Sequence, residues 1–116
     1  MIVSNTFWRD ADAYVRDFGG LGLEIDGVVT SLDTGFRKPH ASMFDEALRL
    51  AGCDARACVF IGNVEELDIE PAAERGMRTI RVCIEDPVPE RSRADAVVTS
   101  LHNAAEIIRD WTRPAG

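Results

Sequence analysis

The 116-residue sequence lacks the features of several protein classes. It has no apolar run approaching the ~20 residues that span a bilayer, and no charged N-terminal region followed by an apolar stretch. It also lacks a Lys/Arg-rich run: 13 Lys and Arg stand against 20 Asp and Glu, for a net charge of −7. Because phosphate neutralisation supplies most non-specific nucleic-acid affinity, and anionic membranes attract basic segments, we expect no nucleic acid and no membrane as partners.

Cysteine is scarce as well. Cys53, Cys58 and Cys83 are odd in number and show no C-x-x-C spacing, so neither a disulfide framework nor a zinc site is supported. We predict that these side chains are small buried apolar groups in a reducing cytosol, which makes the expected location cytoplasmic.

The overall composition of the chain is that of a folded domain. The chain is 46% hydrophobic and 28% charged, with a mean hydropathy of −0.09, so it should fold. At this length the chain can bury one core and no second domain. We therefore expect residues 1–116 to form a single α/β domain.

Short apolar runs alternate with segments of helical period. The predicted strands are 1–4, 28–31, 58–61, 79–84 and 96–99, and the predicted helices are 7–18, 39–51, 69–77 and 101–111. Only residues 85–93 read as a long surface loop. Alternation of this kind predicts a Rossmann-like three-layer α/β fold with a mainly parallel sheet.

Polar residues follow three of the predicted strands. Ligands in such sheets bind beyond the carboxyl ends of the strands, where Ser4, Ser31 and Asn63 are found. Lys38 directly precedes a predicted helix, and Asp68 follows the third strand. A hydroxyl and an ammonium group suit a phosphoryl group, and a carboxylate at the same edge suits Mg²⁺.

The order and spacing of three segments, 3–6, 31–40 and 61–79, resemble the haloacid dehalogenase (HAD) superfamily. Its members are mostly Mg²⁺-dependent phosphohydrolases, and the resemblance runs from Ile2 to about Val82. It implies a HAD-like core domain, a phosphorylated small molecule as substrate and Mg²⁺ as cofactor.

The resemblance also implies roles for particular residues. Ser4 matches a residue that hydrogen-bonds the phosphoryl oxygen, and Lys38 matches one that offsets charge on the nucleophile and phosphoryl group; Asn5, beside Ser4, is a third catalytic candidate. The alternative readings are a helix-capping hydroxyl for Ser4 and a solvated surface charge for Lys38. Asn63 and Asp68 match the acidic metal motif, but Asn63 stands where the family usually has Asp, so we expect weak Mg²⁺ affinity.

The family's nucleophile has no counterpart at the expected place. Its first motif, an apolar strand ending in D-x-D, precedes the Ser4 motif, but Ser4 is only three residues after Met1. Asp10-Ala11-Asp12 falls in a helical pattern, and Glu24 stands only 14 residues before Lys38, too few for the family's strand–helix unit. Neither is expected to attack phosphorus.

The missing strand would be central in the family's sheet, between the strands that end at Ser4 and at Gly62. Either those two strands close on each other, or a second chain, a swapped strand or upstream residues fill the space. Three hypotheses follow: a truncated or degenerate HAD-like hydrolase, inactive alone; one half of a split hydrolase completed by a partner segment with the nucleophile; or a non-catalytic binding or self-association module. The expected partners are accordingly a second copy or a complementing chain.

Overall fold

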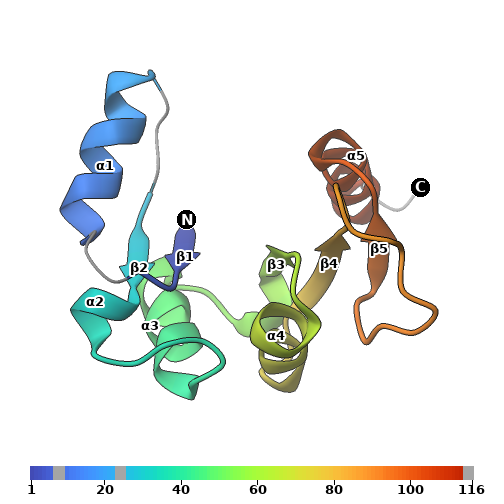
Figure 1. Cartoon of the computed structure of the whole chain (residues 1–116), viewed down its shortest axis with the longest axis horizontal. Helices are drawn as coiled ribbons and strands as arrows, with labels where there is room; N and C mark the ends of the chain where they lie inside the picture. The colour runs from blue at the N-terminus through green and yellow to red at the C-terminus, as the bar shows by residue number, and fades with distance from the viewer. Residues whose placement is uncertain (7–9, 23–25, 114–116) are drawn as a thin grey trace. The chain divides into compact units, whose positions relative to one another are not determined.

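The computed structural model describes residues 1–6, 10–22 and 26–113 of the chain. The chain forms two compact units, Met1–Asp54 and Ala55–Gly116 (Figure 1). All the strand pairs in the described residues are parallel, and helices alternate with the strands. The predicted α/β class with parallel sheets is thus confirmed, whereas the assignment of 1–116 to one domain stays a prediction. No helix in the described part of the chain is long and apolar enough to cross a membrane.

The first unit is built on a two-stranded sheet. Strands β1 (Ile2–Ser4) and β2 (Val28–Thr30) pair so that Ser4 lies opposite Thr30. Helices α1 (Ala11–Gly20), α2 (Ser31–Thr34) and α3 (Ala41–Ala51) complete the unit. Helix α3 contacts both strands and contributes Met43 and Phe44, which are fully buried, to the core.

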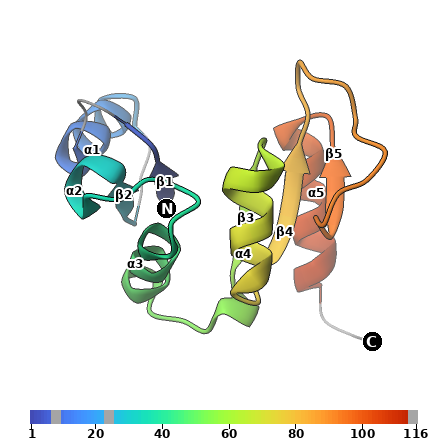
Figure 2. The same cartoon turned by 60° about the horizontal axis from the view of Figure 1, so that its bottom comes forward.

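The second unit is a three-stranded sheet in the order β3–β4–β5. Its elements are η1 (Ala55–Ala57), β3 (Val59–Gly62), the π-helical turn η2 (Glu65–Ile69), α4 (Glu70–Glu74), β4 (Arg78–Val82), β5 (Ala96–Val98) and α5 (Leu101–Thr112). Ile80 and Val82 pack with Val98 and with Ala104 of α5. Helices α4 and α5 both pack against strands of this sheet (Figure 2). Arg81 of β4 pairs with Glu65 of η2.

Within the described residues, β1 and β3 each have one strand as neighbour, β2 and β4 respectively. Each strand therefore has a second edge that no described strand covers, and a strand edge is a row of backbone donors and acceptors. These two strands are the ones that the resemblance places on either side of the missing central strand.

Two helices begin later than the sequence pattern predicts. Helix α1 starts at Ala11 because Asp10, in an extended conformation, accepts a hydrogen bond from the Ala13 N–H (2.9 Å) and caps the helix; residues 7–9 of the predicted helix lie outside the described residues. Pro39 does not open α3. His40 is the N-cap, with Nδ1 accepting from the Ser42 N–H (3.1 Å).

The end of α3 at Ala51 and the start of α5 at Leu101 agree with the sequence analysis, whereas α4 ends at Glu74, three residues before the predicted end. Gly52 ends α3 with a φ of 67°, Pro71 lies in the first turn of α4, and Ser100 caps α5 by accepting from the Asn103 N–H (3.1 Å). The short helix α2, directly after β2, was not predicted. The prediction of buried cysteines is right for Cys83 and wrong for Cys53, which is exposed just after the end of α3.

The chain turns tightly where β3 ends at Gly62. A Cβ atom on Gly62 would overlap Cβ of Asp68 and lie 2.7 Å from its Oδ2, so a side chain at this position would force its surroundings to shift. Asp68 is buried, and its Oδ2 accepts a hydrogen bond from the Val64 N–H (3.1 Å). The absence of a side chain at Gly62 is what lets the Asp68 carboxyl group sit against the end of the strand.

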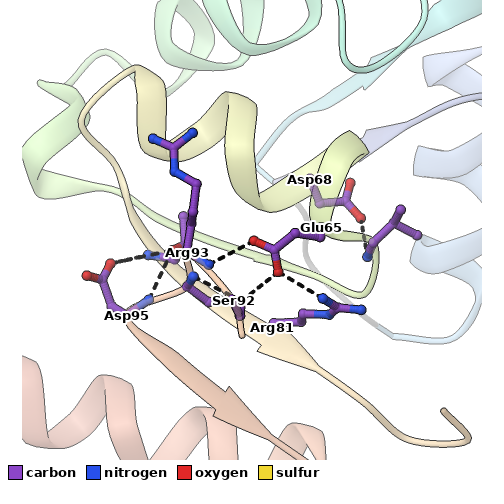
Figure 3. Close-up of polar contacts among 9 residues, drawn as sticks. Glu65, Asp68, Arg81, Ser92, Arg93 and Asp95 are labelled. Carbon is purple, nitrogen blue, oxygen red and sulfur yellow. Dashed lines mark hydrogen bonds and ion pairs between the residues drawn. The ribbon is translucent and has the colours of Figure 1, made fainter. Parts of the chain in front are cut away.

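Glu65 joins this turn to β4 and to the loop before β5 (Figure 3). Its Oε1 accepts from Arg81 Nη1 (2.8 Å) and Ser92 Oγ (2.6 Å), and its Oε2 accepts from the Arg93 N–H (2.9 Å). Burial by itself raises the pKa of Glu65, but the hydrogen bonds from Ser92, Arg93 and Arg81 outweigh it and hold the pKa below its ordinary value. The ionised carboxylate is therefore a structural tie across the second unit.

Gly62→Ala should lower the free energy of unfolding by about 1–3 kcal/mol, because the added methyl group overpacks against Asp68. Gly19→Ala is the control, since a Cβ at this position in α1 meets nothing within 4 Å; its stability should stay equal or rise slightly. Urea unfolding followed by circular dichroism measures both. A Gly62→Ala protein as stable as the wild type would contradict the close approach.

Glu65→Gln should lower the free energy of unfolding at pH 7 by about 1–3 kcal/mol, because the change leaves Arg81 without its charged acceptor. Since folding lowers the pKa of Glu65, its contribution is complete above the unfolded value of about 4.3 and disappears as the pH falls through the folded pKa. The difference in the free energy of unfolding between Glu65→Gln and wild type should thus become smaller as the pH is lowered. Urea titrations between pH 7 and pH 3 measure it. Exposed Glu66, changed to Gln, is the matched control and should alter stability by less than about 0.5 kcal/mol. A difference for Glu65→Gln that stays constant with pH would contradict this account.

Candidate functional site

Ser4 lies at the carboxyl end of β1, where the predicted phosphoryl site begins. Its Oγ is 2.9 Å from the hydroxyl oxygen of Tyr14, one turn into α1. The alternative reading of Ser4 as the cap of the next helix is wrong, because Asp10 caps α1. Ser4 is therefore a strand-end hydroxyl whose partner is another hydroxyl.

Asn5 connects this strand end to Lys38, the only lysine in the sequence. The Asn5 Oδ1 atom accepts the Lys38 N–H (2.7 Å), and Asn5 Nδ2 donates to the Lys38 carbonyl oxygen (3.3 Å). The Lys38–Pro39 peptide bond is cis. The Asn5 side chain thus binds both backbone groups of a residue 33 positions away, and it holds the Lys38 backbone next to the end of β1.

A second tie lies next to the first. Ser31 Oγ accepts from the Thr6 N–H (2.7 Å) and donates to the Thr6 carbonyl oxygen (2.8 Å). Ser31 is buried at the start of α2, so this strand-end hydroxyl serves to join the chain after β1 to the chain after β2. Together the two ties place Ser4, Asn5 and Lys38 at one end of the two-stranded sheet, as the sequence predicts.

Asn63 and Asp68 lie in the second unit and differ in their surroundings. Asp68 is buried against Gly62, whereas Asn63 is exposed. Asn63 lines a pocket of about 420 Å³ at the carboxyl ends of β3 and β4. The other lining residues are Ile61, Gly62, Val82, Ile84, Glu85, Asp86 and Leu101.

The chemistry of these donors fits only part of a magnesium site. Mg²⁺ takes oxygen ligands, and its protein sites rely on one or two carboxylates with water and substrate phosphate. Asp68 offers one carboxylate, with one oxygen engaged by the Val64 N–H, and Asn63 offers an uncharged amide oxygen. In the described ranges no three His, Cys, Asp or Glu side chains cluster in a way that could hold a metal ion. The described residues therefore do not make a complete Mg²⁺ site by themselves, and the roles of Asn63 and Asp68 stay predictions.

The two candidate replacements for the nucleophile have different outcomes. Asp10 is the N-cap of α1 and Asp12 lies in its first turn, so this D-x-D belongs to a helix start, as expected from the sequence. Glu24 lies outside the described residues.

Sequence reasoning missed two parts of the site. Asn5 was singled out without a role, and only the fold shows that it binds the backbone of Lys38. Tyr14 was not singled out at all, because nothing local distinguishes it except that it is the only tyrosine in the chain.

Comparison with known proteins agrees with this geometry. A model of the haloacid dehalogenase-like hydrolase family matches residues 1–76. The chain is 32% identical over 94 residues to a glyceraldehyde 3-phosphate phosphatase of Methanocaldococcus jannaschii, covering 78% of this chain and 41% of that protein. It is 41% identical over 76 residues to a glyceraldehyde 3-phosphate phosphatase of Methanothermobacter thermautotrophicus, covering 66% of this chain and 34% of that protein.

A solved structure shows the same fold. The 2-haloacid dehalogenase of Pseudomonas syringae pv. Tomato superposes with a TM-score of 0.72 at 32% identity, over 83% of this chain and 43% of that one. The chain thus spans less than half the length of these relatives. The resemblance found in the sequence is confirmed, and the chain belongs to the haloacid dehalogenase-like hydrolase family.

Proposed function

We propose that these 116 residues carry the phosphoryl-binding part and the acidic motif of a phosphatase that acts on small phosphorylated molecules. In this proposal Ser4 donates a hydrogen bond to the phosphoryl group, Lys38 offsets its charge and Asn5 positions Lys38. Asn63 and Asp68 belong to the metal side of the site, with Mg²⁺ as the proposed cofactor. We keep the cytoplasm as the proposed location.

The observation that carries the proposal is the pair of hydrogen bonds between the Asn5 side chain and the Lys38 backbone. A surface lysine needs no such support, and a side chain that satisfies both backbone groups of one residue fixes where its ammonium stem begins. In the proposal, the Lys38 ammonium group and the Ser4 hydroxyl together stabilise the transferring phosphoryl group.

The names of the relatives support the substrate class. Two relatives at 32% and 41% identity are glyceraldehyde 3-phosphate phosphatases, so a phosphorylated three-carbon compound is the first substrate to test. The 2-haloacid dehalogenase at 32% identity makes a haloacid the obvious competing substrate.

Covalent phosphoryl transfer needs a nucleophile placed in line with the leaving oxygen. Asp10 and Asp12 are used at the start of α1. We propose that the attacking aspartate comes from a further strand, on an upstream segment or another chain, that adds to the edges of β1 and β3 that no described strand covers.

The 116-residue protein should release no phosphate from p-nitrophenyl phosphate or glyceraldehyde 3-phosphate in the presence of Mg²⁺. Co-expression with a segment that carries an apolar strand ending in D-x-D should restore turnover. In the complemented enzyme, Lys38→Ala should lower kcat by at least about 100-fold, the usual cost of removing one charge-stabilising donor. Asn5→Ala should lower it less, because the ammonium group remains but is no longer positioned.

Arg16→Ala is the control for charge, because Arg16 is an exposed cation on α1 in the same unit; its kcat should match the wild type. Two outcomes would contradict the proposal. One is turnover by the 116-residue protein alone that persists in Asp10→Asn and Glu24→Gln variants. The other is chloride release from 2-chloropropionate by the complemented enzyme without phosphate-ester hydrolysis.

A second candidate function is self-association through strand edges, which would make the chain a non-catalytic binding module. The observation that favours it is that β1 and β3 each have one neighbour among the described strands. Under this alternative, sedimentation velocity should show a concentration-dependent dimer, and a proline in place of Val3 should abolish it by removing a backbone donor from β1. A protein that remains monomeric at high concentration would exclude this alternative.

A further inference from the structure

The hydroxyl groups of Ser4 and Tyr14 form a pair at the proposed phosphoryl site. Their oxygens are 2.9 Å apart, both residues are half-buried, and either oxygen can be the donor. Tyr14 has no part in the proposed function as stated above. Its hydroxyl can affect how Ser4 binds a phosphoryl group, and the inference therefore rests on the proposed function of Ser4.

Tyr14 reaches Ser4 because the start of α1 is anchored. The Ala11 N–H donates to Asp33 Oδ2 (2.9 Å), and the same oxygen accepts from Thr30 Oγ1 (2.7 Å) at the end of β2. The first turn of α1 is therefore attached to the strand that pairs with β1. Tyr14 follows Ala11 by three residues, so its ring projects from this anchored turn.

The ring of Tyr14 is also supported within the helix. It stacks on Phe18 one turn later, with ring centroids 6.4 Å apart and an angle of 14° between the planes. This contact involves only the ring, so the hydroxyl group can be removed by changing Tyr14 to Phe while the packing of the ring is kept.

Each hydroxyl has one proton to donate and lone pairs with which to accept. A phosphoryl oxygen is only an acceptor, so Ser4 must donate its proton to that oxygen to bind it. The Ser4–Tyr14 bond then persists in one direction only, with Tyr14 donating to Ser4 Oγ. A hydrogen bond received by Ser4 Oγ also strengthens the bond that Ser4 donates, because hydrogen bonds in a chain polarise one another.

We propose that Tyr14 is a positioning residue of the phosphoryl site. Its hydroxyl donates to Ser4 Oγ and directs the Ser4 proton toward the bound phosphoryl group. In the opposite role, Tyr14 competes with phosphate for the Ser4 proton. The two roles predict opposite changes in phosphate affinity when the Tyr14 hydroxyl is lost. Losing the Tyr14 hydroxyl weakens phosphate binding if it positions Ser4, and it strengthens binding if it competes.

The test is a titration of the ¹⁵N-labelled 116-residue protein with inorganic phosphate at constant pH and ionic strength, followed by NMR chemical shifts. The proteins are wild type, Ser4→Ala, Tyr14→Phe, the double variant and Lys38→Ala. Tyr14→Phe should raise the dissociation constant by about three- to tenfold, the effect of one ordinary hydrogen bond. In the Ser4→Ala background the same change should have no further effect, because Tyr14 acts through Ser4.

Phe18→Leu is the matched control, since it disturbs the ring contact and leaves both hydroxyls in place; its dissociation constant should equal that of the wild type. The proposal is overturned if Tyr14→Phe leaves affinity unchanged or increases it, if its effect is the same with and without Ser4, or if Phe18→Leu weakens binding as much. In those cases a loss of affinity in Ser4→Ala and Lys38→Ala still supports the proposed function. If neither of these two variants differs from wild type, the proposed function fails together with the inference.

Discussion

The hydrogen bonds between the Asn5 side chain and the Lys38 backbone are the constraint on which the first unit's site depends. Lys38 lies in a short irregular segment between α2 and α3, which would leave its position free without a tie to the sheet. Asn5 hydrogen-bonds both backbone groups of Lys38, so it satisfies this segment's backbone donor and acceptor as a neighbouring strand would in a sheet. The Lys38 backbone is thereby attached to the end of β1, where we propose that the phosphoryl group binds.

The second unit uses the same principle with charge. Glu65 accepts hydrogen bonds from β4 and from the loop before β5, and Asp68 sits where Gly62 has no side chain. Glu65 therefore stabilises the fold of the second unit. Asp68, three residues later in the same turn, is the residue that matches the family's acidic motif. This division explains how an acidic segment can contain several carboxylates, of which only one matches the family's metal motif.

The chain departs from the family's sequence pattern at particular positions. Asn63 replaces the expected aspartate with an uncharged oxygen donor, and the only D-x-D of the described residues begins a helix. The residues that match the phosphoryl-binding motifs have well-defined hydrogen bonds, whereas in our proposal the attacking aspartate comes from a further strand.

The sequence pattern was sufficient for the strands, for most of the helices and for the family. Runs of Val and Ile predicted five strands to within two residues of their observed ends, because that signal resides in neighbouring residues. The order and spacing of three short motifs identified the HAD family. The start of α3 was misplaced, since Pro39 is compatible with a first helical turn and only the His40 side chain decides the cap. The Asn5–Lys38, Ser4–Tyr14 and Glu65–Arg93 contacts were beyond sequence reasoning. They join residues 10 to 33 positions apart, and which side chains meet at such separations is decided only when the strands pair and the helices pack against them.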